Sequence, residues 1–150
     1  MSSPDSSYAF AEQVGHLLRK AYQRHVAIFQ QNVGESQLTA MQFITLCAVC
    51  DNGPSSLTEL VALTAVDQAT IRGIVERLKA RELVDLGHDA RDRRKVIVHL
   101  SAAGRLAVER TVPAAQEISE LTMSNLNPVE RVAMLFLLRK MVADPADQPG

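Results

Sequence analysis

Four cationic side chains fall within five consecutive positions near the middle of the chain: Arg91, Arg93, Arg94 and Lys95. They lie where a β-hairpin is expected to turn, because the residues from Lys95 to Leu100 alternate as a short strand does. Like charges gathered on a protruding loop repel one another unless an anion meets them, and the phosphates of DNA are the obvious candidate. The cluster therefore predicts a contact with nucleic acid.

A helix–turn–helix pattern precedes this cluster, between Ser56 and Arg81. Ser56 and Glu59 predict a capping box for its first helix, and Asp67 can cap the second. In the second helix apolar residues at helical spacing pack inward, namely Ile71, Val75 and Leu78. The polar side chains left facing outward are Gln68, Thr70, Arg72, Glu76 and Arg77. A helix able to enter a major groove, followed by a basic hairpin over residues 83–100, is the arrangement of a winged helix.

Four further helices are expected around this pattern. Apolar positions at helical spacing predict one helix over residues 8–33, and a second is expected to run through Cys50 to the breaker at residues 51–54. A helix after residue 101 is expected to kink at Pro113, within or near its early part, and a last helix follows residue 127. Capping residues mark three of these starts, namely Thr39 with Gln42, Ser101, and Asn127 with Glu130. Residues 1–7 and 144–150 are expected to be disordered.

These elements predict one domain, mainly α-helical with a small β-hairpin wing. The winged helix–turn–helix core spans roughly residues 39–100, and the terminal helices lie at roughly residues 8–33 and 101–143. Both terminal helices are apolar on several faces, as in the last one with Val132, Leu135, Phe136, Leu138 and Met141. A second copy can bury these faces, which predicts dimerisation helices and a homodimer. The alternative is a monomer whose termini fold back on its own core.

Composition and charge agree with a local DNA-binding surface. The chain has 150 residues, 47% of them hydrophobic, and a net charge of −1, which argues against an unspecific nucleic-acid coat protein. Residues 72–95 nevertheless carry eight Lys and Arg against five Asp and Glu. The first ten residues lack a basic stretch and a long apolar run, so we expect a cytoplasmic protein, associated with the nucleoid when bound to DNA.

The segment from Leu57 to Gly104 resembles the MarR family of bacterial winged-helix regulators. The matching pieces are Leu57–Leu60, Ala69–Ile71, Val75–Leu78, Leu83–Val84, Asp92–Arg94 and Leu100–Gly104. An Asp-x-Arg wing followed by Leu-Ser-x-x-Gly is a specific signal, whereas a helix–turn–helix alone is a weaker one. The order of the flanking helices extends the resemblance over nearly the whole chain.

The resemblance implies a homodimeric, ligand-responsive repressor whose recognition helices enter successive major grooves of a pseudopalindromic operator. Gln68, Thr70 and Arg72 then face the groove, and Arg77 contacts phosphate or buttresses the helix. Arg94 matches the arginine that reaches the minor groove, and Asp92 matches the acid that holds the wing in shape. Arg91, Arg93 and Lys95 complete the DNA-binding set. The chain departs from its relatives at Gly73, where many have arginine, and at Glu82, where they have glycine.

Physical chemistry supports these roles and also offers a plainer interpretation. An arginine in a major groove can bind guanine through two hydrogen bonds, and one in a narrow minor groove reads the shape of the duplex. Arg72 and Arg77 could instead belong to an ordinary solvated helix face, with Glu76 nearby. Arg72 and Arg77 come shortly before the Asp92–Arg94 wing in the sequence, which favours the DNA-binding interpretation for them.

The resemblance also implies a cleft for a small aromatic acid between the first two helices and the winged-helix core. A cation from the first helix beside apolar walls would suit a carboxylate on a flat ring. The candidate effector-binding residues are His16, Arg19, Lys20, Phe43 and Leu46, and His25 belongs to the same polar set on the first helix. The alternative for each polar residue is a solvated position on a long helix.

Other signals point away from catalysis. The sequence contains no phosphate loop, HExxH or GxSxG motif, so we expect no enzyme activity, no cofactor and no metal site. Cys47 and Cys50 have redox-motif spacing but fall in an apolar helix, where thiols act as small hydrophobic side chains. Two alternative functions remain: a winged-helix module that binds protein rather than DNA, and a thiol-based redox regulator using Cys47.

Overall fold

The computed structural model describes residues 7–147. Six α-helices and three short strands make up most of this part of the chain, which confirms the mainly α-helical winged-helix fold. The elements are α1 (Val14–Asn32), α2 (Ala40–Asn52), β1 (Ser55–Ser56), α3 (Leu57–Thr64), α4 (Gln68–Ala80), β2 (Val84–His88), β3 (Val96–Leu100), α5 (Ala102–Thr122) and α6 (Pro128–Val142).

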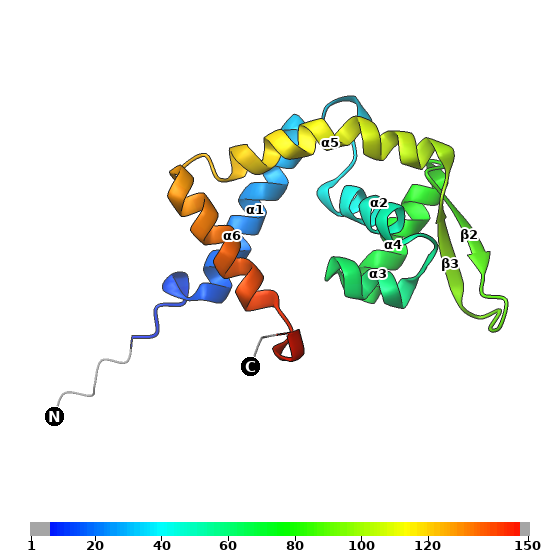
Figure 1. The fold of residues 1–150 in the computed structure, drawn as a ribbon, viewed down its shortest axis with the longest axis horizontal. Helices are drawn as coiled ribbons and strands as arrows, with labels where there is room; N and C mark the ends of the chain where they lie inside the picture. Colours follow the sequence, from blue (N-terminus) through cyan, green and yellow to red (C-terminus); the bar gives the residue numbers. More distant parts are fainter. Residues whose placement is uncertain (1–6, 148–150) are drawn as a thin grey trace.

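The molecule has two ends joined by α5, which runs along the top of the view in Figure 1. Helices α1 and α6 lie at one end, and α2, α3, α4 and the sheet lie at the other. Helix α5 contacts both α1 and α2, so a single long helix links the two ends. Within residues 7–147 no helix is long and apolar enough to cross a membrane.

Local capping sets the helix starts, largely as the sequence predicts. The capping boxes of Thr39 with Gln42 and of Asn127 with Glu130 both form completely. The Ser101 hydroxyl accepts from the Gly104 backbone N–H at 3.0 Å. At α3 the prediction was half right: Ser56 Oγ accepts from the Glu59 N–H, but the Glu59 carboxylate accepts from the Ser56 hydroxyl rather than from its backbone amide.

The sheet has three antiparallel strands in the order β1-β3-β2, one more than the predicted hairpin. In the hairpin Leu86 is opposite Val98, and on the other side of β3 Ser55 is opposite Val98. Strand β1 escaped prediction because two serines have neither strand propensity nor an alternating pattern. Its pairing closes one edge of β3 and ties the start of α3 to the wing.

Three expectations about the helices were wrong in detail. The first helix begins at Val14 rather than near residue 8, because Gln13 is extended and a 3-10 turn at Phe10–Glu12 precedes it. Pro113 lies in the middle of α5 rather than early in it. The end of the chain was expected to be disordered, but Pro145–Asp147 forms a 3-10 turn. Residues 1–6 and 148–150, for which disorder was also expected, lie outside the described residues.

Glu82 lies in the turn between α4 and β2, at a position whose backbone conformation favours glycine. Its φ is +60°, in the left-handed region that glycine adopts most easily. Two hydrogen bonds hold the turn: the Glu82 N–H donates to the Lys79 carbonyl at 2.9 Å, and the Glu82 carbonyl accepts from the Ser101 hydroxyl at 2.7 Å. The turn therefore adopts the left-handed conformation with glutamate in place of glycine.

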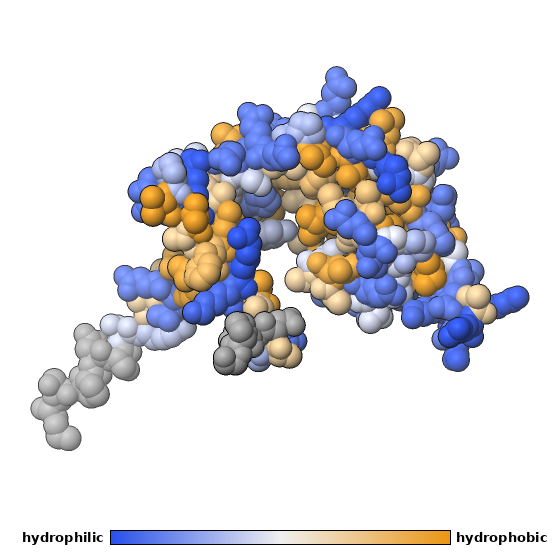
Figure 2. All heavy atoms as spheres, viewed as in Figure 1, coloured by the Kyte–Doolittle hydropathy of each residue, from blue (hydrophilic) through white to orange (hydrophobic). Residues whose placement is uncertain are grey.

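The core is concentrated at the winged-helix end. Leu46, Leu60, Ile71, Leu78 and Val98 are all fully buried there. Helix α6 contributes no buried residue, although most of its side chains are apolar. The exposed apolar side chains of α6 include Val129, Val132, Leu135, Phe136, Leu137 and Met141, and Figure 2 shows hydrophobic surface over this end.

Candidate DNA interface and ligand cavity

Helix α4 presents a polar face because its apolar side chains are used by the core. Ile71, Ile74, Val75 and Leu78 are buried, while Gln68, Arg72 and Arg77 are exposed. The helix contacts β2, which fixes its position relative to the hairpin. Gln68 and Arg72 are two of the three residues predicted to face a groove, and Arg77 is the predicted phosphate or buttressing contact. The fold leaves all three free to meet a partner surface.

Thr70, the third residue predicted to face the groove, is engaged within the protein. Its backbone N–H donates to Asp67 Oδ1 at 2.9 Å and its hydroxyl donates to Asp67 Oδ2 at 2.7 Å. These hydrogen bonds stabilise the carboxylate and lower the pKa of Asp67. Thr70 therefore has its methyl group and the lone pairs of its oxygen left for an external contact.

Arg77 folds back along the outer side of α4. A Cβ placed on Gly73 would lie 3.9 Å from Arg77 Nη1, so the guanidinium sits one turn back, beside the glycine. Since residues four apart are neighbours on a helix surface, the absent side chain of Gly73 leaves this space open.

Two aspartates shape the wing between β2 and β3. Asp89 Oδ1 accepts from the Arg91 N–H at 2.7 Å, and Asp92 Oδ1 accepts from the Arg94 N–H at 3.0 Å. Backbone bonds from Lys95 to Asp92 and from Asp89 to Lys95 close the turn. Asp92 thus occupies the position from which an acid can hold the loop in shape.

The cationic side chains of the wing point into solvent. Arg91, Arg93, Arg94 and Lys95 are all exposed, and the Arg94 side chain retains 96% of its accessible surface. The Asp92 carboxylate lies 3.6 Å from Arg94 Nε, a weak exposed ion pair. Hydrophilic surface covers this tip at the lower right of Figure 2. The wing therefore offers an anionic polymer four cations on a turn fixed by its backbone.

A cavity of about 520 Å³ lies at the other end of the molecule, between α1, α5 and α6. Its walls are largely apolar, with Met134, Leu135 and Leu138 from α6. Helix α1 contributes its polar and cationic residues, namely Lys20, Arg24 and His25. The volume is within the range of small-molecule sites, and the mixture of apolar wall and cations suits an organic anion.

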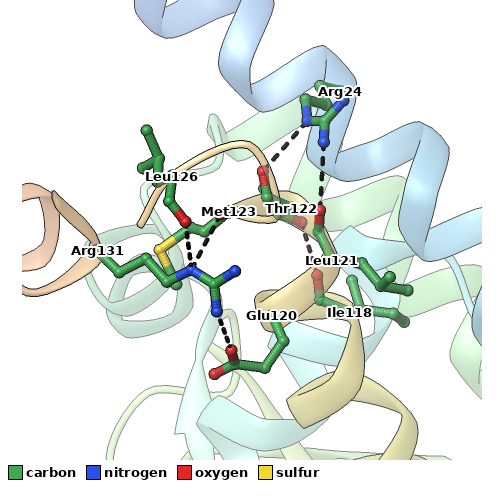
Figure 3. Close-up of polar contacts among 8 residues, drawn as sticks. All are labelled: Arg24, Ile118, Glu120, Leu121, Thr122, Met123, Leu126 and Arg131. Carbon is green, nitrogen blue, oxygen red and sulfur yellow. Dashed lines mark hydrogen bonds and ion pairs between the residues drawn. The ribbon is translucent and has the colours of Figure 1, made fainter. Parts of the chain in front are cut away.

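Arg24 holds one edge of this cavity by capping the end of α5. Its guanidinium donates to the carbonyl oxygens of Thr122 at 3.2 Å and Leu121 at 3.3 Å, and to Ser124 Oγ at 3.2 Å. Figure 3 shows Arg24 reaching from α1 to the last turn of α5. Carbonyl groups at a helix C-terminus lack partners in the helix, so a cation is stabilising there.

Arg131 secures the corner between α5 and α6 in a similar way. Its Nε donates to the carbonyl oxygens of Met123 at 3.1 Å and Leu126 at 3.0 Å, and its Nη1 forms a 2.7 Å ion pair with Glu120. Both arginines appear in Figure 3, on opposite sides of the same corner. The corner that supports the cavity is therefore fixed from α1 and from α6.

His25 adds a neutral imidazole to the cavity wall. Its Nδ1 lies 3.0 Å from Thr122 Oγ1, and the Thr122 hydroxyl donates to the Ile118 carbonyl at 2.8 Å. With the hydroxyl proton used in this way, the oxygen accepts from Nδ1–H, which assigns the tautomer. Burial lowers the pKa of His25, so the ring is neutral at pH 7 and its Nε2 is a hydrogen-bond acceptor.

The structure does not bring the five candidate effector residues together. Lys20 lines the cavity, but Phe43 and Leu46 are buried in the core. The His16 ring packs edge-on against Phe10 with ring centres 5.2 Å apart, and Arg19 is exposed. Arg24 also lines the cavity but was not among the predicted effector residues, although it follows Lys20 by one helical turn and so shares its face.

Cys47 is not placed for thiol chemistry. Cys47 is half-buried, and burial, aided by the charge of Asp51 and by Cys50, raises the pKa of its thiol to about 11. Such a thiol is protonated at neutral pH and reacts slowly with oxidants. The Cys50 sulfur accepts a long 3.7 Å hydrogen bond from Arg105. The burial of Cys47 and its raised pKa favour the role of a small apolar side chain.

Comparisons with known proteins agree on one family. The model of the MarR family matches residues 36–95. The chain is 63% identical to the HTH-type transcriptional repressor NicR of Pseudomonas putida, over 92% of this chain and 87% of that protein. Among solved structures, BpsR of Bordetella bronchiseptica, whose DNA binding is regulated by 6-hydroxynicotinic acid, is 58% identical with a TM-score of 0.83, covering 89% of this chain and 96% of BpsR. Escherichia coli MarR bound to operator DNA has a TM-score of 0.79 at 24% identity, over 91% of this chain and all of that one, and supports the fold alone.

Proposed function

The chain belongs to the MarR family, and we propose that it is a homodimeric transcriptional repressor released from its operator by a small aromatic carboxylate. The observation that carries the proposal is the pairing of the exposed face of α4 with four exposed cations on a wing fixed by Asp92. A module that binds only protein has no need for such a cluster. We place its action at the chromosome, in the cytoplasm.

Each DNA-facing residue has a role that follows from its chemistry. Gln68 and Arg72 can read base edges in the major groove, and Thr70 offers its methyl group to thymine. Arg77 and the wing residues Arg91, Arg93 and Lys95 neutralise phosphates, which positions the protein without specifying sequence. Arg94, whose side chain is 96% exposed, enters the adjacent minor groove and reads its width.

The dimer uses the terminal helices, with α6 at its centre. Val129, Val132 and Phe136 form a continuous exposed apolar surface together with Ala133. A monomer rarely leaves such a surface in water, and a second copy of the same helix can cover it. Two recognition helices then meet successive major grooves, about 34 Å apart along the duplex.

The α1–α5–α6 cavity is the proposed effector site. NicR is 63% identical to this chain, and BpsR responds to 6-hydroxynicotinic acid, a flat ring that carries a carboxylate. Lys20 supplies a cation for that carboxylate, and the neutral His25 can accept a hydrogen bond from a ring substituent. Helix α5 links this cavity to the winged helix. A ligand in the cavity can therefore favour a dimer whose two recognition helices have a different spacing. That dimer no longer fits the operator, so the DNA is released.

Selection of genomic fragments by the purified protein, followed by binding measurements over a salt series, tests the DNA-binding role. We expect an enriched pseudopalindrome bound by the dimer, with affinity that falls as salt rises. Arg94→Ala should weaken binding at least tenfold and reduce the slope of affinity against salt, since it removes one contact from each half-site. Absence of any enriched palindrome would instead support the protein-interaction module.

The effector site has its own test, since Lys20 is exposed and takes part in no hydrogen bond among residues 7–147. We expect 6-hydroxynicotinate to release the wild-type protein from DNA, and Lys20→Met to need about tenfold more ligand because a carboxylate partner is lost. Affinity of Lys20→Met for the operator without ligand should be unchanged. Arg19→Met, one position earlier and outside the cavity, is the matched control. Equal responses of the two variants would move the site elsewhere.

A further inference from the structure

Gly73 is an unexpected residue for its place in the fold. It lies inside α4, five positions after the helix begins and seven before it ends. Apart from proline, glycine is the residue least favourable to a helix interior, because it has the most backbone freedom to lose. Replacing Gly73 with almost any residue other than proline should therefore make α4 more stable.

Nothing within the protein requires a glycine there. A Cβ on Gly73 would meet only Arg77 Nη1, at 3.9 Å, which is an ordinary van der Waals contact. The residue does not have the positive φ that favours glycine. Gly104 differs sharply, since a Cβ there would overlap the backbone of Leu83. The fold therefore accounts for Gly104 but gives no reason for Gly73.

The position of Gly73 on the helix points to an external reason. Residues of an α-helix are about 100° apart around the axis, so Gly73 lies opposite the buried face formed by Ile71, Ile74, Val75 and Leu78. The exposed side chains of Arg72 and Arg77 lie on either side of it, and the exposed Glu76 shares the outward face between Arg72 and Gly73. Within residues 7–147 neither guanidinium forms an ion pair, so both are available to an anionic partner.

We propose that Gly73 is the point at which α4 approaches the floor of the major groove most closely, and that it is a specificity-determining position. This inference rests on the proposed function of α4 as the recognition helix. Without a Cβ, the helix backbone comes close enough to the base pairs for Arg72 and Arg77 to reach groups on both sides of it. A side chain at this position lifts the helix and withdraws both arginines together.

The test combines stability and DNA binding in the full-length protein, using Gly73→Ala and Gly73→Leu. We expect Gly73→Ala to raise the Tm by about 2–4 °C, because alanine favours the helix, and to weaken operator binding at least tenfold. Gly73→Leu should weaken it further. The slope of affinity against salt should fall, because the phosphate contact of Arg77 is lost in each half-site, and fragment selection should show altered preference at the base pairs facing α4.

Gly15→Ala is the matched control, because Gly15 is also helical with open space around its Cβ position. Because α1 belongs to the helices proposed for the dimer, operator affinity is compared at a concentration where sedimentation shows both proteins as dimers, and it should then stay within twofold. Wild-type affinity and unchanged base preference in Gly73→Ala overturn the inference, as does a lower Tm, which would assign the glycine to the fold. If the wild-type protein itself selects no DNA sequence, the proposed function fails, and that result is distinct from a failure at Gly73 alone.

Discussion

Gly104→Ala is expected to destabilise the protein by about 3 kcal/mol or more, the upper end of overpacking effects. Gly104 lies in the first turn of α5, buried against the hairpin. An added Cβ would overlap the Leu83 carbonyl oxygen and lie 2.8 Å from Leu100 Cδ1. Because the Leu83 carbonyl is backbone and also accepts from the Ser101 N–H, it cannot move without disturbing the start of α5. Urea unfolding followed by circular dichroism measures the effect.

The matched control for this substitution is Gly73→Ala, which makes the same chemical change in open space. We expect its unfolding midpoint to rise while that of Gly104→Ala falls. If Gly104→Ala does not accumulate as folded protein on its own, the same variant purified and unfolded as a complex with operator DNA, which stabilises the native state, gives a second measurement. An unchanged midpoint in Gly104→Ala would mean that α5 does not pack on the hairpin as closely as described.

Phe136→Glu is expected to convert the dimer to a monomer and to weaken operator binding more than a hundredfold. Phe136 is 62% exposed on α6, so the substitution costs the isolated chain little. In the proposed dimer it would bury a carboxylate in an apolar interface, which is strongly unfavourable. A monomer occupies one half-site and loses the linkage between two recognition helices. Sedimentation and operator binding at matched concentrations give the two readouts.

Leu63→Glu provides the control for adding a charge to an exposed apolar position, because Leu63 is 53% exposed on α3, at the winged-helix end. It should remain a dimer. Val132 lies on the same exposed surface as Phe136, so Val132→Glu should also give a monomer. Agreement between the two variants shows that the effect belongs to the surface and not to one side chain. Dimers that persist in both α6 variants would place the interface on another surface of the chain.

The sequence predicted best where the deciding interactions are local. The caps at Thr39, Asp67, Ser101 and Asn127 join residues three apart, so their residue types are sufficient to indicate where helices begin. The same holds for the wing, whose Asp92–Arg94 turn is closed by neighbours in the chain. Periodicity also placed the core face of α4, because burial follows the helical repeat.

Long-range packing decided what the sequence could not. Strand β1 exists because Ser55 meets Val98, and the cavity exists because Arg24 and His25 meet the end of α5 almost a hundred residues later. No local pattern encodes such contacts, and the predicted effector residues do not share one cavity: Lys20 lines it, whereas Phe43 and Leu46 lie in the core. The amino-acid sequence by itself determined the family, the helix starts and the cationic wing, since each depends on neighbouring residues. Only the tertiary structure decided which side chains share a cavity and which glycine the fold requires, because those depend on surfaces that meet after folding.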